Sequence, residues 1–539
     1  MQKGKVKFAI KFKKEGLMKA KILLLCLFAL LVSLTSCSGN SQKKSSKKEL
    51  RTSVDVEPNS VDPRVGGNRK SQNIIQMLYE GLYRTGKGDE YVPAVAESYE
   101  ISDDYRRVTF HLRDCKWSNG EPLTAFDFER SWKEALEPSF PPDYSYAYFI
   151  LKNGEAAKRG EVTLDEVGVK AIDDKTLFVE FQKPYPHFLE YIACPCYAPV
   201  YPKDSNDNRV SNGPFRMVCW KANREIKAVK NEHYWDKDSV NLDGITVAII
   251  EDTNTALLMW EQGELDLVGG PFAPFPLEAI PMMKNRGQLQ TDMSGGIYWI
   301  NFNTKAVPFN SAKVRKAFAY AINRQELVDH LLQGGEEPAM SVLPGSMNLQ
   351  KEGYFRDGDL EVAKALFEEG LNELGITRKE LGPIELNYCT TVGEKNIAQA
   401  LQSQWKKAFG VQVNILGTER KAYVSKALNR DFMVRTATWF SWTMDPSYNL
   451  GFVKSLNHNN MTQWENPVYK DLIETAEQMS DMAGKRKTFH EAEKILMSEM
   501  PIAPIYFHTY KMVINDNIKG FKLTRSGLPE YKYITMASE

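Results

Sequence analysis

Histidines and cysteines are the residues whose chemistry a single sequence reveals most directly. The chain contains seven of each. No two histidines stand at the spacing of metal ligands, and they occur at positions 111, 187, 233, 330, 458, 490 and 508. His490-Glu491 begins like a helical zinc motif, but Lys494 occupies the place of the second histidine. The sequence therefore predicts no metal and no cofactor.

Catalytic motifs with fixed spacing are also absent from the sequence. The chain has no G-x-S-x-G nucleophile turn, no G-x-x-x-x-G-K-[ST] phosphate loop and no G-x-G-x-x-G after a predicted strand. Acidic residues far apart in a sequence can still meet in a fold and form a hydrolytic pair. We therefore expect a protein that is not an enzyme, and a secreted hydrolase stays open as an alternative.

The cysteines do not form the framework of a disulfide-rich protein. Once Cys26 and Cys37 near the N-terminus are set apart, an odd number remains, so at least one thiol stays free in a monomer. Cys194-Pro195-Cys196 lacks the C-x-x-C spacing of a metal or redox motif. This pattern favours a buried pair of small apolar residues. The cysteines of the body are Cys115, Cys194, Cys196, Cys219 and Cys389.

Aromatic residues gather in two short stretches that are candidates for a binding site. Residues 438–446 read TWFSWTMDP, in which Trp439, Phe440 and Trp442 run into an Asp-Pro that should end their element. Tyr144, Tyr146 and Tyr148 alternate in a segment expected to be extended, where alternate residues share one face. Each stretch could line a binding site or belong to a core.

The N-terminus reads as an export signal. From Met18 onward, two lysines precede an apolar stretch that is too short to span a membrane, followed by Leu34-Thr35-Ser36-Cys37. That tetrapeptide resembles the lipobox of bacterial lipoproteins, in which the cysteine carries the lipid. The sequence predicts a signal peptide over residues 1–36, and a lipidated Cys37 with a flexible tether over residues 37–51.

Charge and length describe the remaining body. Residues 1–50 contain twelve lysines and two glutamates, a balance of +10, so residues 51–539 carry −10 in a chain with zero net charge. A mildly acidic body argues against a nucleic-acid partner, because phosphate binding needs clustered basic residues. With 539 residues the chain is long enough for two to four domains or lobes.

The elements that must position the aromatic stretches follow a mixed α/β pattern. A strand over 384–390, a helix over 394–409 and a strand over 411–416 predict a parallel βαβ unit. The next strand, 432–440, carries Trp439 and Phe440. The last residues, 510–539, should pair with a sheet begun early in the chain. Other predicted elements are helices at 126–136, 253–262 and 359–374, a helix with Ile74, Ile75, Leu78 and Leu82 on one side, a helix from Asn323 to Gly334, and strands at 106–113, 176–181, 213–219, 244–250 and 297–303.

Several motifs, in order along the chain, resemble the oligopeptide/dipeptide-binding family of ABC-transporter substrate-binding proteins. The similarity runs from about residue 52 to residue 535. The motifs are EPNSVDP (57–63), MLYEGLY (77–83), the segment 93–132, GPFRMVCW with NEHYWD (213–236), the segment 300–328 and the segment 490–507.

The resemblance implies an α/β, bilobal periplasmic-binding-protein-like fold with an extra domain on the first lobe. The first lobe would be discontinuous, with residues 52–86, 201–294 and 507–539. The additional domain would be residues 87–200, and the second lobe residues 295–506. The family performs no catalysis; it closes around a ligand and hands it to a membrane permease driven by ATPase subunits.

The resemblance also assigns expected roles to residues of the cleft. Peptide-binding members end a second-lobe strand in Trp-x-x-Asp, whose aspartate pairs with the α-amine of the peptide. Here Trp439 matches the tryptophan, whereas Trp442 stands in place of the aspartate and Asp445 is the nearest acid. The other cleft candidates are Phe440, Arg435, Tyr144, Tyr146, Tyr148, Gly66 and Gly67.

We therefore expect a monomeric, lipid-anchored receptor that captures peptides for an ABC importer. It would face the periplasm in a Gram-negative organism and the cell surface in a Gram-positive one. Because Trp442 cannot pair with an amine as a carboxylate does, a modified peptide or a non-peptide solute stays open as the ligand. A cell-surface interaction or chaperone role would instead need an exposed apolar patch.

Overall fold

The computed structural model describes residues 47–66, 68–86, 90–141, 144–202, 210–344, 347, 349–391, 393–441, 443, 445–456, 460–524 and 526–537. The predicted signal peptide and Cys37 lie outside these residues. Within them, no helix is both long and apolar enough to span a membrane. The body from Lys48 to Glu539 clusters as one unit.

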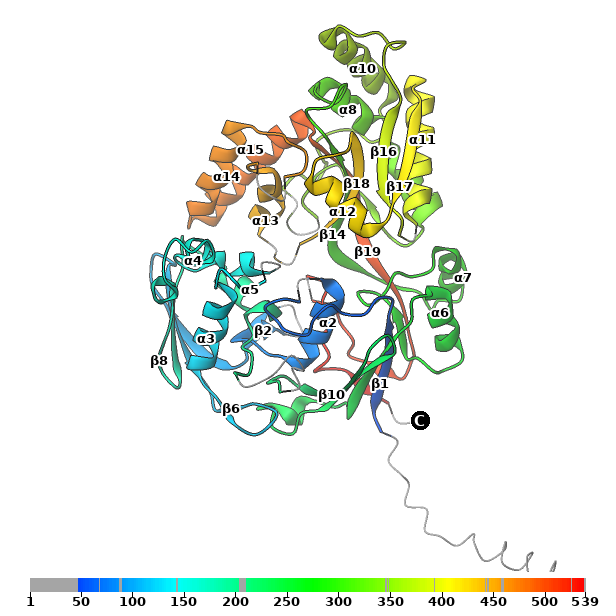
Figure 1. Ribbon diagram of the computed structural model, residues 1–539. Coiled ribbons are helices and arrows are strands. Elements are labelled where there is room, and N and C mark those ends of the chain that lie inside the picture. Colours follow the sequence, from blue (N-terminus) through cyan, green and yellow to red (C-terminus); the bar gives the residue numbers. More distant parts are fainter. Residues whose placement is uncertain are drawn as a thin grey trace, which may run out of the picture. The chain divides into compact units, whose positions relative to one another are not determined.

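One large mixed sheet runs through the body (Figure 1). Two of its strands, β14 (Gln290–Phe302) and β19 (Ile502–Ile514), are long and antiparallel to each other, with Ile297 opposite Phe507. They link strands from the early part of the chain to strands from the later part. In order across the sheet these are β10 (Phe215–Lys221), β11 (Glu225–Lys230), β12 (Gly244–Ile249), β1 (Glu49–Val54), β13 (Leu267–Gly269), β19 (Ile502–Ile514), β14 (Gln290–Phe302), β18 (Val434–Phe440), β16 (Ile384–Cys389) and β17 (Val413–Thr418), with β15 (Glu337–Pro338) paired to β19.

Smaller sheets complete the strands. A four-stranded sheet has the order β4 (Ala96–Ile101), β5 (Arg107–Leu112), β9 (Thr176–Glu180), β8 (Val169–Asp173), and helix α3 (Ala125–Ala135) contacts β8 and β9. The strand pairs are β2 (Tyr83–Thr85) with β3 (Tyr91–Pro93), β6 (Cys115–Lys116) with β7 (Pro122–Leu123), and β20 (Ile518–Lys519) with β21 (Thr535–Met536).

Helices alternate with strands along the chain and lie beside the sheets (Figure 1). The remaining α-helices are α2 (Arg69–Leu78), α4 (Gly154–Lys158), α5 (Phe188–Ile192), α6 (Thr253–Glu261), α7 (Ile280–Asn285), α8 (Ala312–Tyr320), α9 (Arg324–Glu326), α10 (Leu360–Leu374), α11 (Glu394–Phe409), α12 (Arg420–Leu428), α13 (Pro446–Leu450), α14 (Pro467–Gln478) and α15 (Met482–Glu499). The shorter helical segments are η1 (Ser145–Ile150), η2 (Leu164–Glu166), η3 (Pro195–Tyr197), η4 (Lys237–Ser239), η5 (Leu277–Ala279), η6 (Leu327–Leu332) and η8 (Gly451–Val453).

Separate apolar cores coincide with different stretches of the chain. One core is built from residues between Leu82 and Tyr201. A second combines Leu50 and α2 with strands β10 to β13 and with Tyr531 and Ile534 near the C-terminus. Two further cores lie among residues between Ile297 and Phe507, on the two faces of β14. The first of these cores also includes Leu82 and Tyr83.

Several predicted elements are confirmed. Strands β16 and β17 are parallel with α11 between them, as the βαβ pattern predicts. Thr124 and Asp127 form a reciprocal capping box at the start of α3. Strand β19 pairs with β13 and so returns the end of the chain to the early sheet. The first two outcomes follow from short-range patterns of spacing and capping, whereas the pairing of β19 with β13 is a contact between distant parts of the chain.

Other predicted elements are wrong at their ends. Strand β1 begins at Glu49, so the last residues assigned to the tether belong to the sheet, where Leu50 is fully buried. Helix α2 ends at Leu78, before Leu82. The helical segment after Asn323 ends at Leu332, because Gln333 adopts a positive φ before Gly334 is reached. Strand β14 begins at Gln290, seven residues before the predicted start.

Glu493 of α15 is a carboxyl group buried in the later part of the chain. Its oxygens accept hydrogen bonds from the Val342 amide at 3.0 Å and from the Tyr354 hydroxyl at 2.8 Å. Burial raises the pKa of Glu493 to about 7, and these hydrogen bonds oppose the rise only in part. Below about pH 7 the folded state therefore favours the protonated form of Glu493.

We expect Glu493→Gln to stabilise the protein more at pH 8 than at pH 5, by about 2–3 kcal/mol. The pKa of Glu493 is higher in the folded chain than its ordinary value of 4.5. The contribution of this group to stability is therefore lost as the pH rises from about 4.5 through about 7. Urea unfolding at both pH values measures the difference. Glu491→Gln on the same helix is the matched control, because its side chain is half-exposed and the change should alter the free energy of unfolding by less than about 0.5 kcal/mol.

Candidate functional site

The aromatic stretch lies where strand β18 ends. Strands β16 and β17 run parallel to each other, and β16 also runs parallel to β18, so the carboxyl ends of all three meet at one edge. Open α/β sheets bind ligands at such edges. Trp439 and Phe440 are the last residues of β18, and Asp445 then caps the short helix α13 ahead of Pro446. Strand β18 thus ends before the Asp-Pro sequence, as predicted, and that sequence begins a new helix.

Trp439 is half-buried within a group of aromatic rings. Its indole stacks on Tyr448 at 5.3 Å between ring centres and meets Phe452 edge-on at 4.8 Å. Trp299 lies parallel to it at 6.3 Å. Its Nε1 is buried and has no hydrogen-bond partner among the described residues. A buried donor without a partner costs about 1–3 kcal/mol, so Trp439 retains a group that a ligand can satisfy.

Phe440 contacts Arg69, from the early part of the chain, and His508 of strand β19. The guanidinium of Arg69, the first residue of α2, lies 5.5 Å from the centre of its ring. His508 of β19 meets the ring edge-on at 5.3 Å. One nitrogen of Arg69, Nη1, is buried and has no hydrogen-bond partner among the described residues. We call Trp439, Phe440 and Arg69, with their ring contacts Tyr448 and His508, the β18 site.

His508 is a neutral member of the β18 site. Burial, together with the positive charges of Lys511 and Arg69, lowers the pKa of His508 to about 3. Its Nδ1 lies 3.1 Å from the Ser294 hydroxyl, which also donates to the His508 carbonyl at 2.7 Å. The serine hydrogen is therefore engaged with a backbone carbonyl, and this pair lacks the arrangement of a hydrolase nucleophile and base.

Asp445, the acid nearest to Trp442, already has a cationic partner. Its buried carboxylate lies 3.0 Å from Nζ of Lys485, a buried residue of α15. It also accepts hydrogen bonds from the Ser447 amide at 2.9 Å and the Tyr191 hydroxyl at 3.4 Å. Burial alone would raise the pKa of Asp445, but the charge of Lys485 and these hydrogen bonds hold it below its usual value. The carboxylate stays ionised and internally neutralised.

Arg435 is buried on β18 without a carboxylate ion pair among the described residues. Its guanidinium lies over the rings of Tyr423 at 4.5 Å and Phe432 at 5.8 Å. Nη1 contacts Sδ of Met461 at 2.9 Å, and Nε has no hydrogen-bond partner among the described residues. Arg435 therefore keeps a charge and a donor that an anionic group of a ligand could meet.

The three tyrosines do not share one face, because their segment is not extended. Residues Ser145–Ile150 form the 3₁₀ helix η1, which buries Tyr144 and Tyr148 and leaves Tyr146 42% exposed. Tyr146 hydrogen-bonds Tyr448, the ring that stacks on Trp439. The prediction of a common tyrosine face is wrong, and Tyr146 contacts the β18 site through Tyr448.

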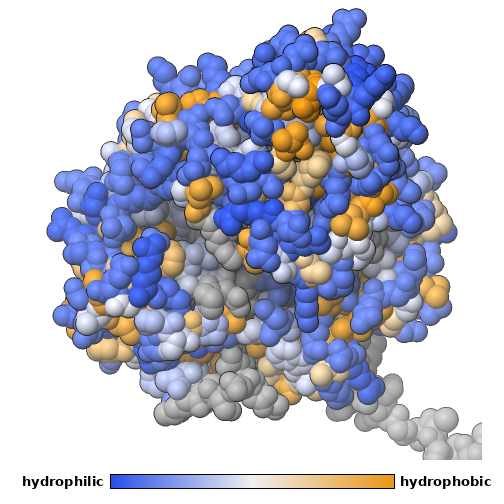
Figure 2. Space-filling model, turned by 45° about the horizontal axis from the view of Figure 1, so that its top comes forward, coloured by the Kyte–Doolittle hydropathy of each residue, from blue (hydrophilic) through white to orange (hydrophobic). Residues whose placement is uncertain are grey.

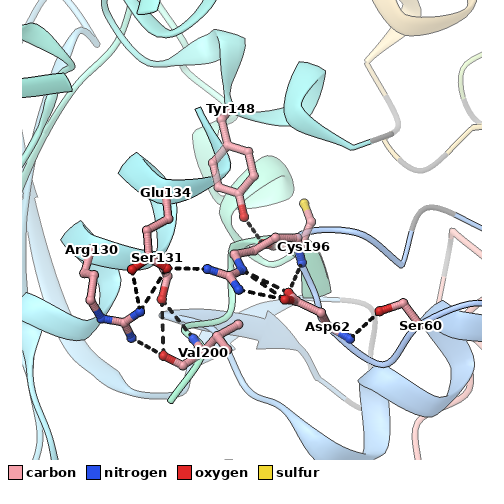
Figure 3. Close-up of polar contacts among 9 residues, drawn as sticks. Ser60, Asp62, Arg130, Ser131, Glu134, Tyr148, Cys196 and Val200 are labelled. Carbon is pink, nitrogen blue, oxygen red and sulfur yellow. Dashed lines mark hydrogen bonds and ion pairs between the residues drawn. The ribbon is translucent and has the colours of Figure 1, made fainter. Parts of the chain in front are cut away.

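Gly66 is buried by its own chain. A Cβ at this position would lie 2.3 Å from Ile75 of α2, so the glycine permits close packing of the loop on its helix. The loop is also tied to α3, because Arg64 pairs with Asp62 at 2.7 Å and with Glu134 at 2.5 Å (Figure 3). Gly67 and Trp442, the other two candidates, lie outside the described residues.

Sequence reasoning missed several residues of this region. Arg69, Tyr448, Tyr191 and Lys485 have no local motif, since each acquires its partner only through folding. Glu394 was also missed. It begins α11 at the edge formed by β16 and accepts hydrogen bonds from the hydroxyls of Tyr298 at 2.6 Å and Thr436 at 3.2 Å. Burial raises the pKa of Glu394, and the two hydroxyls oppose this shift.

The surface and the side chains of the described residues indicate which contacts this region can make with a ligand. The face drawn in Figure 2 is hollowed near its centre, and most of the described surface around the hollow is hydrophilic. No group of three or more possible metal ligands occurs among the described residues. The described groups of the β18 site can stack, donate hydrogen bonds and attract an anion.

Comparison with known proteins connects this arrangement to a family. A family model described as bacterial extracellular solute-binding proteins, family 5 Middle, matches residues 90–461. The oligopeptide-binding protein OppA of Bacillus subtilis (strain 168) is 37% identical over 528 residues, which cover 94% of this chain and 97% of OppA. The probable deoxycholate-binding periplasmic protein YgiS of Escherichia coli (strain K12) is 30% identical over 491 residues, 87% of this chain and 89% of YgiS.

A solved structure agrees with these sequence matches. The Escherichia coli murein tripeptide binding protein MppA covers 92% of this chain with a TM-score of 0.82 and 28% identity, and the match spans 99% of MppA. The predicted α/β, bilobal periplasmic-binding-protein-like fold is thereby confirmed. Members of the family act outside the cytoplasm as solute-binding proteins. The chain belongs to the bacterial extracellular solute-binding proteins of family 5.

Proposed function

We propose that the protein captures peptides between two lobes and delivers them to an ABC importer. The observation that carries this proposal is the similarity over nearly the whole chain to proteins named for binding oligopeptides and a murein tripeptide. The β18 site suits such a ligand, because Trp439 Nε1 and Arg69 Nη1 adjoin aromatic rings and have no hydrogen-bond partner among the described residues. A peptide offers both carbonyl acceptors and apolar side chains.

The proposed lobes follow the division expected from the sequence. The first lobe comprises residues 52–86, 201–294 and 507–539, with the additional domain at 87–200, and the second lobe comprises residues 295–506. The separate apolar cores support this division, and β14 and β19 are the strands that pass between the lobes. The contact of Arg69 with Phe440 and that of Tyr191 with Asp445 then join first-lobe residues to second-lobe residues.

The proposal extends to the anchor and the partners. Cys37 carries a lipid that holds a monomeric receptor to a bacterial membrane, and permease and ATPase subunits receive the peptide. The signal-like residues 1–36 and the Leu-Thr-Ser-Cys sequence support export and lipidation. Mass spectrometry of the mature N-terminus tests the anchor, and a lipid-free N-terminus would exclude it.

A solute without a free α-amine is the second candidate ligand. Two observations favour it: Asp445 is already paired with Lys485, and one relative is named for deoxycholate. Thermal shift and calorimetry with free-amine peptides, their N-acetylated forms and deoxycholate separate the two candidates. Binding of free peptides that acetylation abolishes would exclude the second candidate, and binding of deoxycholate alone would exclude the first. Consumption of the ligand would instead indicate a hydrolase.

Trp439→Ala is expected to weaken binding of the ligand found in that screen by about tenfold or more. A central aromatic anchor typically contributes over 1 kcal/mol to an interface, and about 1.4 kcal/mol corresponds to a tenfold change in Kd. Calorimetry with the folded variant measures the change. Trp220→Ala is the matched control, because it removes another half-buried indole, on β10, whose Nε1 bonds Glu57. An unchanged Kd with a lowered Tm would place Trp439 in the core.

A further inference from the structure

The thiols of Cys194 and Cys196 lie side by side in the structure. Cys194 precedes η3, and Cys196 is its second residue. Their sulfur atoms are 3.2 Å apart, and the Cys196 thiol donates to the Cys194 sulfur. Both residues are buried and both are free thiols. Proximity of the sulfurs is thus a feature of the fold that the C-x-C spacing by itself did not indicate.

Fixed backbone contacts hold the two cysteines in this arrangement. The Tyr148 hydroxyl donates to the Cys196 carbonyl, as Figure 3 shows. Nε1 of Trp132 donates to the Tyr197 carbonyl at 2.9 Å. Three residues further on, the Val200 amide donates to the Ser131 hydroxyl at 2.9 Å. Each of these contacts comes from α3 or η1, and together they hold the backbone from Cys196 to Val200 against these two elements.

The surroundings of the pair distinguish one sulfur as a nucleophile. Gln72 donates to the Tyr144 hydroxyl at 2.5 Å, which frees the tyrosine hydrogen for the Cys194 sulfur 3.8 Å away. Burial raises the pKa of the Cys194 thiol, but the hydrogen bonds from Cys196 and Tyr144 outweigh it and hold this pKa below the usual value. Burial and the bond to Cys194 raise the pKa of Cys196 well above the usual value.

We propose that Cys194 and Cys196 are joined by an intrachain disulfide, formed by exchange with a disulfide of the extracytoplasmic compartment. Compartments outside the cytoplasm favour disulfides, and the family acts there. The proposed disulfide does not depend on which ligand the protein binds, because it requires only export and the geometry of these two residues.

The exchange proceeds in two steps that balance. The Cys194 thiolate attacks one sulfur of the external disulfide, forms a mixed disulfide, and releases a thiolate that takes up the proton lost by Cys194. The Cys196 sulfur then attacks the Cys194 sulfur, and the second external thiolate leaves with the Cys196 proton. The chain loses two hydrogens and the external disulfide becomes two thiols. Both sulfurs are buried in the packed segment, so the disulfide product is protected from reductants.

Differential thiol labelling of the full exported chain tests the proposal. Free thiols are blocked with N-ethylmaleimide in denaturant, disulfides are then reduced, and the released thiols are labelled with heavy N-ethylmaleimide. Trypsin yields a peptide from Thr176 to Lys203 that contains Cys194, Cys196 and no other cysteine. We expect heavy label at both cysteines, while the peptides of Cys115, Cys219 and Cys389 carry light label and serve as internal controls.

Two further arms keep the test decisive. Chain that is isolated reduced is unfolded and refolded in a buffer of oxidised and reduced glutathione, and should then carry heavy label at both positions. Cys196→Ser should leave light label at Cys194, whereas Cys219→Ser should not alter the labelling of the pair. Light label at Cys194 and Cys196 in both the exported and the refolded chain would overturn the proposal. Labelling is the readout, because a loop of three residues constrains the unfolded chain little.

Discussion

Replacing Arg84 by methionine is expected to destabilise the protein by about 3–5 kcal/mol, because it leaves two buried carboxylates without their cation. Arg84 is buried and pairs with Glu80 at 2.6 Å and with Glu530 at 2.7 Å. Burial lowers the pKa of Arg84, but the two carboxylates more than compensate and hold it well above its usual value. Glu80 also accepts hydrogen bonds from Tyr234 and Trp235, each at 2.5 Å.

This ion network joins three distant parts of the chain, so its loss should be global. Urea unfolding followed by circular dichroism measures the change in free energy. Arg159→Met is the matched control, because Arg159 pairs with Glu155 on an exposed surface and should cost less than about 1 kcal/mol. Adding Glu80→Gln and Glu530→Gln to Arg84→Met should restore much of the loss. A cost for Arg84→Met no larger than that of the control would contradict the role of the network.

Lys485→Met is the second change with a large expected effect. It should lower the free energy of unfolding by about 3–5 kcal/mol, because it leaves the buried carboxylate of Asp445 without its cation. Both side chains are less than a tenth exposed. Lys470→Met is the matched control, because that lysine pairs across 4.0 Å with Glu474 and both side chains are half-exposed. The double variant Asp445→Asn/Lys485→Met should recover part of the stability, as expected when a buried pair is replaced together.

The same pair predicts a dependence on acid. The pKa of Asp445 is lower in the folded chain than its ordinary value of 3.8, so its contribution is complete above 3.8 and is lost as the pH falls through the folded pKa. Asp445→Asn should therefore flatten the loss of stability below about pH 4 in urea titrations. An identical acid dependence in the variant and the parent chain would show that Asp445 does not titrate in this range.

Lys485→Met also separates two roles for Asp445 in binding. If the carboxylate serves only the fold, calorimetry with the folded variant should give an unchanged affinity for free-amine peptides. If the lysine normally competes with the amine of the peptide, the affinity should rise. Glu394→Gln provides the comparison, because Glu394 is a carboxyl group at the same sheet edge and forms no ion pair among the described residues.

Local patterns determined most of the secondary structure and the family. The capping box of α3, the βαβ unit of β16, α11 and β17, and the end of β18 before Asp-Pro all depend on residues within a few positions of each other. The return of β19 to the early sheet was also predicted. Apart from this long-range return, such signals are visible in one sequence because the interactions they encode are themselves short-range.

The tertiary structure alone decided which candidate residues are available. Lys485, 40 positions from Asp445, and Tyr191, 254 positions from it, occupy a carboxylate that the sequence leaves open. The turn of η1 buries Tyr144 and Tyr148, and the contacts of η3 bring two cysteine sulfurs together. Propensity cannot reveal these outcomes, because each depends on packing between segments that are remote in the chain. The sequence by itself thus determined the family, and folding decided which of the candidate charges and thiols have partners within the chain.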